Sequence, residues 1–332
     1  MTAFRALLIE KTDDGFTRNV VERTLDDLPE GEVTIEVKYS SLNYKDGLSA
    51  TGNPGVTRNF PHTPGIDAAG VVSASSVNEF KAGDEVVVIG FDLGMNTPGG
   101  FGGCIRVPAA WVVARPDGLS LEESMILGTA GFTAALSVSK LEHMGMTPHS
   151  GPVLVTGATG GVGSVAVALL GKLGYEVTAA TGKADKADFL KALGATEIVD
   201  REALHEGTER ALLREHWGGV VDSVGGEILY NAVKALRYGC SATCCGLVSS
   251  SDIPATVLPF ILRSVNLLGV DSVELPLPQK KETWSRLATD WKLDNLTELK
   301  TTLTLDTLSE AIDQILAGNM VGRGVVDLSV SS

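Results

Sequence analysis

The chain has 332 residues, a formal net charge of −14 and an apolar content of 44%. This length allows two domains with a sizeable core. The acidic balance argues against nucleic acids and anionic membranes as partners, because both attract basic surfaces. No apolar run is expected to span a membrane, and the first residues are typical of neither a signal nor a transit peptide. We therefore expect a cytoplasmic protein.

The residues that commonly bind metals show no ligand spacing. The four cysteines form neither a CxxC pair nor a zinc ribbon, and the five histidines are scattered. We therefore expect no metal site and interpret the cysteines as reduced, largely buried thiols. The cysteines are Cys104, Cys240, Cys244 and Cys245.

Residues 1–125 are rich in β-strand signals. Val33–Tyr39 alternates between apolar and polar residues, which is typical of a half-buried strand. Further strands are predicted at Ala6–Glu10, 70–73 and Glu85–Ile89. Short strands at this spacing predict a small barrel.

The rest of the chain alternates between strands and helices. Helical periodicity covers Leu121–Met125 and Ala130–Leu141, and a linker ends near residue 151. Six strands with helical segments between them then predict a doubly wound parallel sheet. We expect these strands near residues 153, 175, 197, 219, 240 and 267. Helices near 280–293 and 307–317 and a strand at Gly324–Leu328 are expected to return to the first domain, which gives boundaries of 1–125, 126–270 and 271–332.

The stretch from Val153 to Lys183 carries the strongest functional signal. A buried strand leads into a glycine-rich turn, a helix follows, and a second strand begins near Tyr175. This order is the first half of a dinucleotide-binding fold, in which glycines admit the pyrophosphate and the helix N-terminus faces it. An ordinary glycine-rich connection is the alternative. The expected contacts are Thr159, Gly160, Gly161, Val162 and Gly163.

The end of the second strand indicates which dinucleotide binds. NAD-binding folds usually place an acidic residue there to hold the ribose 2′-hydroxyl. This chain has Thr181, Gly182 and Lys183 instead, which suit a 2′-phosphate. Arg201, after the third strand, is a further candidate phosphate partner, although it could also be a solvated surface residue. The sequence therefore predicts NADPH.

Six stretches carry a likeness to a known family: Ser40–Asp46, Arg58–Pro61, Pro64–Gly70, Ala82–Val86, Ile126–Ala134 and Pro259–Arg263. Together they resemble the medium-chain dehydrogenase/reductase superfamily, in its zinc-free quinone-oxidoreductase branch. The likeness covers nearly the whole chain and is greatest to the group of acryloyl-CoA reductases. It implies an α/β protein with a GroES-like β-barrel catalytic domain and a Rossmann doubly wound parallel sheet, and commonly a homodimer.

The chain departs from the zinc alcohol dehydrogenases of this superfamily. Those enzymes carry a His-Glu pair where this chain has Ile66 and Asp67, and a cysteine in the region of Asn43–Asp46. They also carry a four-cysteine lobe that has no counterpart here. Without thiolate and imidazole ligands a catalytic zinc site cannot be built, so we expect no alcohol oxidation.

The resemblance places the Asn43–Asp46 motif beside the nicotinamide, where metal-free reduction of an activated alkene would occur. Tyr44 and Asn43 are the candidate catalytic residues, because the Tyr44 hydroxyl can donate to an enolate oxygen. Tyr44 is also a candidate cofactor contact and could serve only in packing. Asn43 and Asp46 could serve only to fix the loop through turn hydrogen bonds.

Further cofactor contacts follow from the fold and from the resemblance. Residues after the later sheet strands face the nucleotide crevice, which selects Leu247 and Ser272. The resemblance adds Asn319 in the returning tail. Arg323 lies in the same tail and could equally be a surface charge. An edge strand near 267–272 could pair across a dimer.

A competing interpretation is a short-chain dehydrogenase. Thr156 and the following glycines fit TGxxxGxG, and Tyr230 and Lys234 fit YxxxK. That family places the glycines near the N-terminus, whereas about 150 residues precede them here. Tyr230 also falls on a helix predicted to pack on the sheet.

Three functions remain after these steps. The first is NADPH-dependent reduction of acryloyl-CoA or a related enoyl-CoA thioester. The second is reduction of free quinones or enones, and the third is cofactor binding with little turnover. Five basic residues are available for the phosphates of CoA, but the sequence does not cluster them. They are Arg58, Arg263, Lys280, Lys281 and Arg286.

Overall fold

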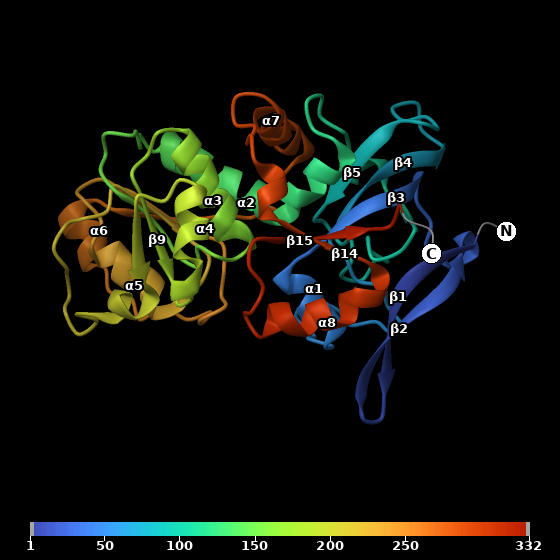
Figure 1. Cartoon of the computed structure of the whole chain (residues 1–332), viewed down its shortest axis with the longest axis horizontal. Helices are drawn as coiled ribbons and strands as arrows, with labels where there is room; N and C mark the ends of the chain where they lie inside the picture. The colour runs from blue at the N-terminus through green and yellow to red at the C-terminus, as the bar shows by residue number, and fades with distance from the viewer. Residues whose placement is uncertain (1–2, 330–332) are drawn as a thin grey trace. The chain divides into compact units, whose positions relative to one another are not determined.

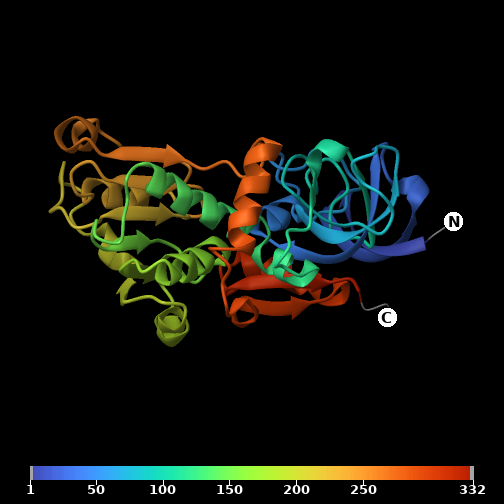
Figure 2. The same ribbon diagram turned by 90° about the horizontal axis from the view of Figure 1, so that it is seen from above.

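A computed structural model describes residues 3–329, which divide into two compact units. The first contains the chain up to Thr129, Val273–Asp290 and the residues from Asp294 onward. The second contains Ala130–Ser272 and Trp291–Leu293. Figures 1 and 2 show the elements of each unit.

The first unit is built on a mostly antiparallel sheet. Its strand order is β14-β15-β3-β4-β5-β7, with β6 also paired to β3, and β1 and β2 form a separate hairpin. The last strand pairs with β3 so that Gly324 lies opposite Leu42, and the residues from Asp294 onward belong to this unit, whereas Trp291–Leu293 belong to the second. The strands are β1 (Ala3–Thr12), β2 (Gly15–Thr24), β3 (Val33–Leu42), β4 (Asp67–Ser75), β5 (Glu85–Ile89), β6 (Cys104–Val107), β7 (Val112–Ala114), β14 (Lys300–Leu303) and β15 (Arg323–Asp327).

Alternation along β3 explains its place at the centre of this sheet. Val33, Ile35 and Val37 are almost fully buried and pack with apolar residues of β4, β5 and β6. Each such side chain stabilises the fold by about 1.5–3 kcal/mol through removal of apolar surface from water. Four helices belong wholly or partly to the unit: α1 (Tyr44–Ala50), the first part of α2 (Leu121–His143), α7 (Leu277–Ala288) and α8 (Leu305–Leu316).

Helix α1 has a weak local signal and depends on its surroundings. It has only seven residues and contains Gly47. A Cβ at this glycine would lie 2.8 Å from the Leu316 side chain, so α1 and α8 approach closely, as Figure 1 shows. The sequence prediction missed this helix because tertiary packing supplies most of its stability.

Helix α2 is interrupted at Gly128, whose φ of 51° and ψ of −158° are not helical. By length and composition it could cross a membrane, with a mean hydropathy of 1.2 in its most apolar window. The expectation that no apolar run reaches this length was therefore wrong. However, 83% of that window is buried inside the protein, so α2 is a core helix.

The second unit contains a six-stranded parallel sheet in the order β10-β9-β8-β11-β12-β13, which confirms the predicted doubly wound topology. The chain starts at the centre, moves out to one edge, and then crosses to the other side of β8. The strands are β8 (Val153–Val155), β9 (Val177–Thr181), β10 (Glu197–Asp200), β11 (Gly219–Asp222), β12 (Ser241–Cys244) and β13 (Asn266–Gly269), and the helices wholly in this unit are α3 (Gly161–Lys172), α4 (Ala187–Ala192), α5 (Gly226–Lys234) and α6 (Leu258–Arg263).

One connection in this unit differs from the prediction. Between β10 and β11 the chain forms a short 3₁₀ turn at Arg201–His205 and then a loop, where a helical segment was expected. The Lys234 ammonium donates hydrogen bonds to the carbonyls of Gly207, Thr208 and Arg210. These carbonyls are therefore directed to a side chain of α5 and not along a helix axis.

Candidate active site

The turn between β8 and α3 has the shape of a dinucleotide cradle. Gly157 has a φ of +59°, and a Cβ there would lie 2.6 Å from Ser223 Oγ. A Cβ at Gly163 would collide with the Gly157 carbonyl. Both positions therefore require glycine, and the first N–H groups of α3, at Gly161 and Val162, have no intrahelical partners. The turn fits a pyrophosphate.

The buried carboxylate of Asp222, at the end of β11, supports this turn through hydrogen bonds. Thr156 donates to Asp222 Oδ1 at 2.7 Å, the Gly225 amide donates to Asp222 Oδ2 at 2.8 Å, and the Ser223 amide donates to Thr156 Oγ1. Burial raises the pKa of Asp222. The contacts fix the carboxyl ends of β8 and β11 against each other. Sequence reasoning missed this pair, although an acidic residue ending a buried strand was a usable signal.

The residues predicted to bind a 2′-phosphate lie together beyond β9. Thr181 Oγ1 lies 3.4 Å from Thr159 Oγ1 and accepts a hydrogen bond from the Lys183 amide at 3.0 Å. A Cβ at Gly182 would lie 2.8 Å from Arg201 Nε, so the guanidinium approaches this turn. Strand β9 ends in the Thr181 hydroxyl, Gly182 and Lys183 follow it, and Arg201 approaches from the end of β10, where it pairs with Glu202 at 3.1 Å. A hydroxyl, a glycine and two cations fit a phosphate and not a ribose diol alone.

The remaining predicted cofactor contacts divide between the units. Leu247 is exposed in the loop after β12, and Ser272 is buried, where its hydroxyl accepts a hydrogen bond from Thr133 at 2.8 Å. Both belong to the second unit. Asn319 belongs to the first unit, in an exposed turn after α8, where its side chain donates to Gln314.

The candidate catalytic motif begins α1 in the first unit. Asn43 is the N-cap residue, and its backbone amide donates to Asp46 Oδ2 at 2.8 Å, which closes a capping box. Tyr44 is the first residue of the helix and is half-buried. No residue between 3 and 329 hydrogen-bonds to its hydroxyl, which leaves that group available to a substrate.

Behind this motif lies a buried polar cluster centred on Asp67, which is fully buried at the start of β4. Its Oδ2 accepts from Asn43 Nδ2 at 2.8 Å, from the Thr129 amide at 2.9 Å and from the Ser41 hydroxyl. Its Oδ1 accepts from the Thr129 hydroxyl. The carboxylate is therefore held by donors from two separate chain segments, one at residues 41–43 and one at Thr129.

Arg323 and Asp46 complete the cluster. The Arg323 side chain is buried, which rules out the surface role considered from sequence; it donates to the Ile126 carbonyl at 2.9 Å and to Asn43 Oδ1 at 3.3 Å. Its Nη2 has no hydrogen-bond partner within residues 3–329. Asp46, also buried, accepts from the Ile66 amide at 2.9 Å. Burial, followed by the charge of Asp67, raises the pKa of Asp46 to about 7.

The same positions do not fit a catalytic zinc ion. Ile66 is buried and has no ligand atom, and the oxygens of Asp67 already accept four hydrogen bonds. Within the described part of the chain, no three His, Cys, Asp or Glu side chains gather in a way that could hold a metal.

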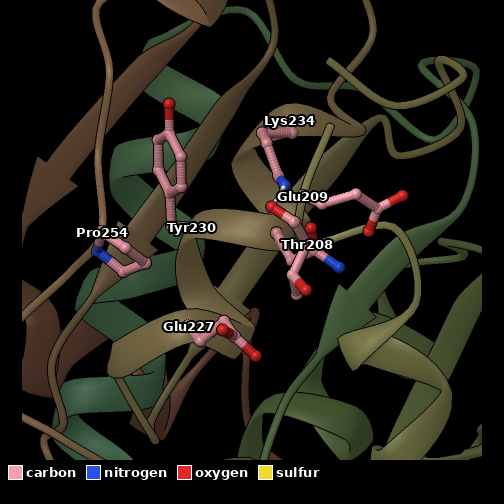
Figure 3. A pocket seen from close by; sticks show the side chains of 7 residues that line it. Thr208, Glu209, Glu227, Tyr230, Lys234 and Pro254 are labelled. Atoms are coloured by element: carbon pink, nitrogen blue, oxygen red, sulfur yellow. Dashed lines mark hydrogen bonds between the residues drawn. The ribbon is translucent and has the colours of Figure 1, made fainter. Parts of the chain in front are cut away.

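Tyr230 and Lys234, the YxxxK pair of the competing interpretation, form hydrogen bonds to backbone groups. Tyr230 donates to the Thr256 carbonyl at 2.9 Å and accepts from the Thr256 amide at 2.7 Å. Lys234 is buried, with its ammonium committed to three carbonyls. Both side chains line a cavity of about 270 Å³ on α5, where Figure 3 shows them as sticks. They do not form a short-chain dehydrogenase site.

Two of the cations considered for CoA are also committed elsewhere. Lys280 is fully buried and donates to the carbonyls of Ile89 and Val273. Arg263 donates to the carbonyls of Lys234 and Leu213. Of the five basic residues considered, these two are therefore poor candidates for binding phosphates.

A glycine cradle in a doubly wound sheet, together with a polar helix start in a β-rich unit, defines a two-domain, dinucleotide-dependent oxidoreductase. Residues 29–117 match the family model described as alcohol dehydrogenase GroES-like domain, and residues 161–291 match that described as zinc-binding dehydrogenase. The chain belongs to the medium-chain dehydrogenase/reductase superfamily.

Three relatives cover nearly the whole chain. The acrylyl-CoA reductase AcuI of Ruegeria pomeroyi is 47% identical, over 98% of this chain and 99% of its own. The yhdH oxidoreductase of Salmonella enterica, solved with NADP, is 43% identical, with a TM-score of 0.95 over 97% of this chain and 99% of that one. Protein yhfP of Bacillus subtilis, solved with NAD, is 44% identical, with a TM-score of 0.96 over 98% and 100%.

Proposed function

We propose that this chain reduces the C=C bond of acryloyl-CoA, giving propionyl-CoA, with NADPH and without a metal. The similarity to AcuI of Ruegeria pomeroyi over almost the whole length carries the choice of substrate. The hydroxyl, glycine and cations at Thr181–Lys183 and Arg201 carry the choice of NADPH.

When bound, NADPH supplies a hydride from C4 of its nicotinamide, which adds to the β-carbon of the enoyl thioester. The turn at Gly157–Gly163 and the start of α3 hold the pyrophosphate. Lys183 and Arg201 neutralise the 2′-phosphate. Asp222 acts only by fixing the turn through Thr156.

As the hydride arrives, negative charge develops on the thioester oxygen and a proton must then reach the α-carbon. We assign the donor at the oxygen to Tyr44, whose hydroxyl has no bond to any residue between 3 and 329. The same hydroxyl, directly or through one water, supplies the proton to the α-carbon. One hydride and one proton thus add across the double bond.

A second candidate is the reduction of free quinones or enones. A relative of Bacillus subtilis, 45% identical over 98% of this chain and 99% of its own, is named "Putative quinone oxidoreductase YhfP". The commitment of Lys280 and Arg263 to carbonyls leaves fewer cations for the phosphates of CoA, which favours this alternative.

A substrate panel separates the two candidates. The wild type and Tyr44→Phe are assayed with acryloyl-CoA, longer enoyl-CoAs, free enones and quinones, each with NADPH and NADH. We expect saturable NADPH oxidation with acryloyl-CoA and a loss of kcat in Tyr44→Phe of about 10²-fold or more. Turnover with quinones alone would favour the alternative. Tight NADPH binding without turnover would contradict both.

We further propose that the enzyme is a cytoplasmic homodimer. Strand β13 is an edge of the parallel sheet, and exposed apolar side chains precede it on α6. An open edge beside apolar surface favours association with another chain. The half-buried, unbridged thiols Cys240, Cys244 and Cys245 are consistent with a reducing compartment.

A further inference from the structure

The bend in α2 is held from both sides by buried charged residues. Before the bend, the Ile126 carbonyl accepts a hydrogen bond from Arg323 Nε at 2.9 Å. After it, the amide and the hydroxyl of Thr129 both donate to Asp67. Thr129 is also the last residue of the first unit before the chain enters the second.

The signs of these charges match the groups that the bend exposes. A helix that ends leaves carbonyls unpaired, and a helix that begins leaves N–H groups unpaired. A guanidinium stabilises the negative end of the first helical segment, and a carboxylate stabilises the positive end of the second. Arg323 and Asp67 therefore cap the two segments from elsewhere in the chain.

The same two residues meet at Asn43, which begins α1. Asn43 Nδ2 donates to Asp67 at 2.8 Å, and Asn43 Oδ1 accepts from Arg323 at 3.3 Å. The side-chain amide of Asn43 is thus oriented by one acceptor and one donor, and it cannot rotate without breaking both hydrogen bonds. Tyr44 follows directly, as the first residue of α1.

We propose that Asp67, Asn43 and Arg323 form a latch that fixes the bend of α2 to the start of α1 and thereby holds Tyr44 in its working position. Asn43 is in this view a positioning residue, with both ends of its amide used inside the cluster. The latch is tightly packed at the bend, because a Cβ at Gly128 would lie 2.6 Å from Asp67 Oδ2. Its link to catalysis rests on the proposed role of Tyr44.

Thr129 offers the mildest test of the latch. Thr129→Val replaces the hydroxyl that donates to Asp67 Oδ1 with a methyl group, and Thr129→Ser keeps the hydroxyl. The matched control is Thr283→Val on α7, a buried hydroxyl that donates to the Gln279 carbonyl of its own helix. All three proteins are compared with the wild type as full-length chains.

The first readout needs no substrate and no coenzyme. Amide hydrogen exchange is followed in peptides covering residues 42–50 and 126–133. The amides of Asp46 and Gly47 donate to the Asn43 carbonyl, so they report the order of the first turn of α1. In Thr129→Val we expect exchange in both peptides to be about 10-fold faster, because local openings become more populated. Thr129→Ser should restore most of the protection, and Thr283→Val should leave both peptides as in the wild type.

The second readout separates positioning from binding. In Thr129→Val we expect kcat with the substrate identified by the panel to fall about 10-fold or more. The Kd for NADPH should stay within about 2-fold, because the residues proposed to hold its phosphates lie in the second unit. Thr129→Ser should regain most of kcat.

The proposal is overturned if Thr129→Val speeds exchange only around residue 129 and leaves 42–50 protected, since Tyr44 would then not be coupled to the bend. It is also overturned if Thr129→Val and Thr129→Ser behave alike. These outcomes are read from exchange in the free protein and are independent of whether the proposed substrate is correct.

Discussion

At the scale of single residues, we expect Lys183 to decide between NADPH and NADH. Lys183→Glu replaces the cation proposed to bind the 2′-phosphate with an anion, which should cost about 1.5–3 kcal/mol for NADPH, or roughly 10- to 100-fold in Kd. NADH has no phosphate there and should lose far less. Titrations of both coenzymes against the free protein measure this ratio.

Lys186 supplies the matched control, because it is near in sequence and forms its ion pair with Asp185 at 2.7 Å. Lys186→Glu makes the same change of charge outside the proposed contact. It should leave the ratio of the two dissociation constants close to that of the wild type. Equal losses for NADPH and NADH in Lys183→Glu would contradict the assignment of the 2′-phosphate.

A second residue, Asp46, should make the folded protein less stable as pH rises, whereas a carboxylate with a lowered pKa has the opposite effect. Burial, followed by the charge of Asp67 on β4, raises the pKa of Asp46 to about 7, while Arg323 on β15 is the opposing charge in the cluster. The folded protein thus keeps a proton that the unfolded chain releases above about pH 4. The contribution of Asp46 to stability therefore falls as pH rises from about 4 to 7, by at most about 1.4 kcal/mol per pH unit.

Urea unfolding between pH 5 and pH 8 measures this contribution. The free energy of unfolding of the wild type should decrease with pH relative to that of Asp46→Asn, which has no titrating group at this position. Glu310→Gln removes an exposed carboxylate from α8 and should follow the wild type. If Asp46→Asn and the wild type gave parallel curves, the carboxyl would not be protonated in the folded protein.

At the scale of elements, the bend of α2 predicts that replacing two different glycines with alanine lowers the free energy of unfolding by different amounts. Gly128 and Gly145 both have positive φ, 51° and 91°, but a Cβ at Gly145 would meet nothing within 4 Å. Gly145→Ala should cost only the backbone strain, about 1–2 kcal/mol. Gly128→Ala should cost about 1–3 kcal/mol more, because its φ and ψ suit almost only glycine and its methyl group displaces the buried bonds of Asp67 and Ser41.

Chemical denaturation of the two variants tests this difference directly. Similar losses of free energy would mean that the cluster moves aside without cost. Such a result would also weaken the idea of a rigid link between the bend and α1, because a latch that tolerates a methyl group is not tight.

The elements that the sequence predicted correctly have local signals. The limits of β5, Glu85–Ile89, follow from a short β-branched run after a turn, and the glycine turn follows from its place between a strand and a helix. Strand β2 was missed although Asp14 and Gly15 mark its hairpin turn. Helix α1 was missed although the spacing of Asn43 and Asp46 fits a capping box.

The polar cluster had no such local signal. Its members come from residues 41–46, 67, 126–129 and 323, which only the folded sheet brings together. Asp67 was noticed only as a departure from a zinc ligand, and Arg323 was left between a cofactor contact and a surface charge. Long-range bonds between buried charges cannot be predicted from spacing, because no periodicity links the segments involved.

At the scale of the whole molecule, the order of the chain makes the first unit depend on its last residues. Strand β15 lies between β14 and β3, and it carries Arg323 into the cluster at α1 and α2. The cluster behind the candidate catalytic motif therefore needs a residue from the last strand of the described chain.

The proposed homodimer is the prediction that belongs to this scale. The Asn266 amide donates to the Cys240 carbonyl, just before β12, and the Val270 amide donates to the Cys244 carbonyl, at its end. The alternation of a strand therefore turns the amides of Leu267 and Gly269 toward the open edge. Val257, Ile261 and Leu262 are exposed beside this strand in the sequence, with Ile261 68% exposed. Covering this surface would remove apolar area from water and pair the edge.

Light scattering after size exclusion tests the dimer at micromolar concentrations. We expect twice the chain mass for the wild type and a shift toward the single-chain mass for Ile261→Asp, because association would bury the new carboxylate without a partner. Met144→Asp places the same charge on another exposed apolar residue, just after α2, and should leave the mass of the wild type. A wild type with the mass of one chain, or an Ile261→Asp variant that keeps the double mass, would rule out association through this edge.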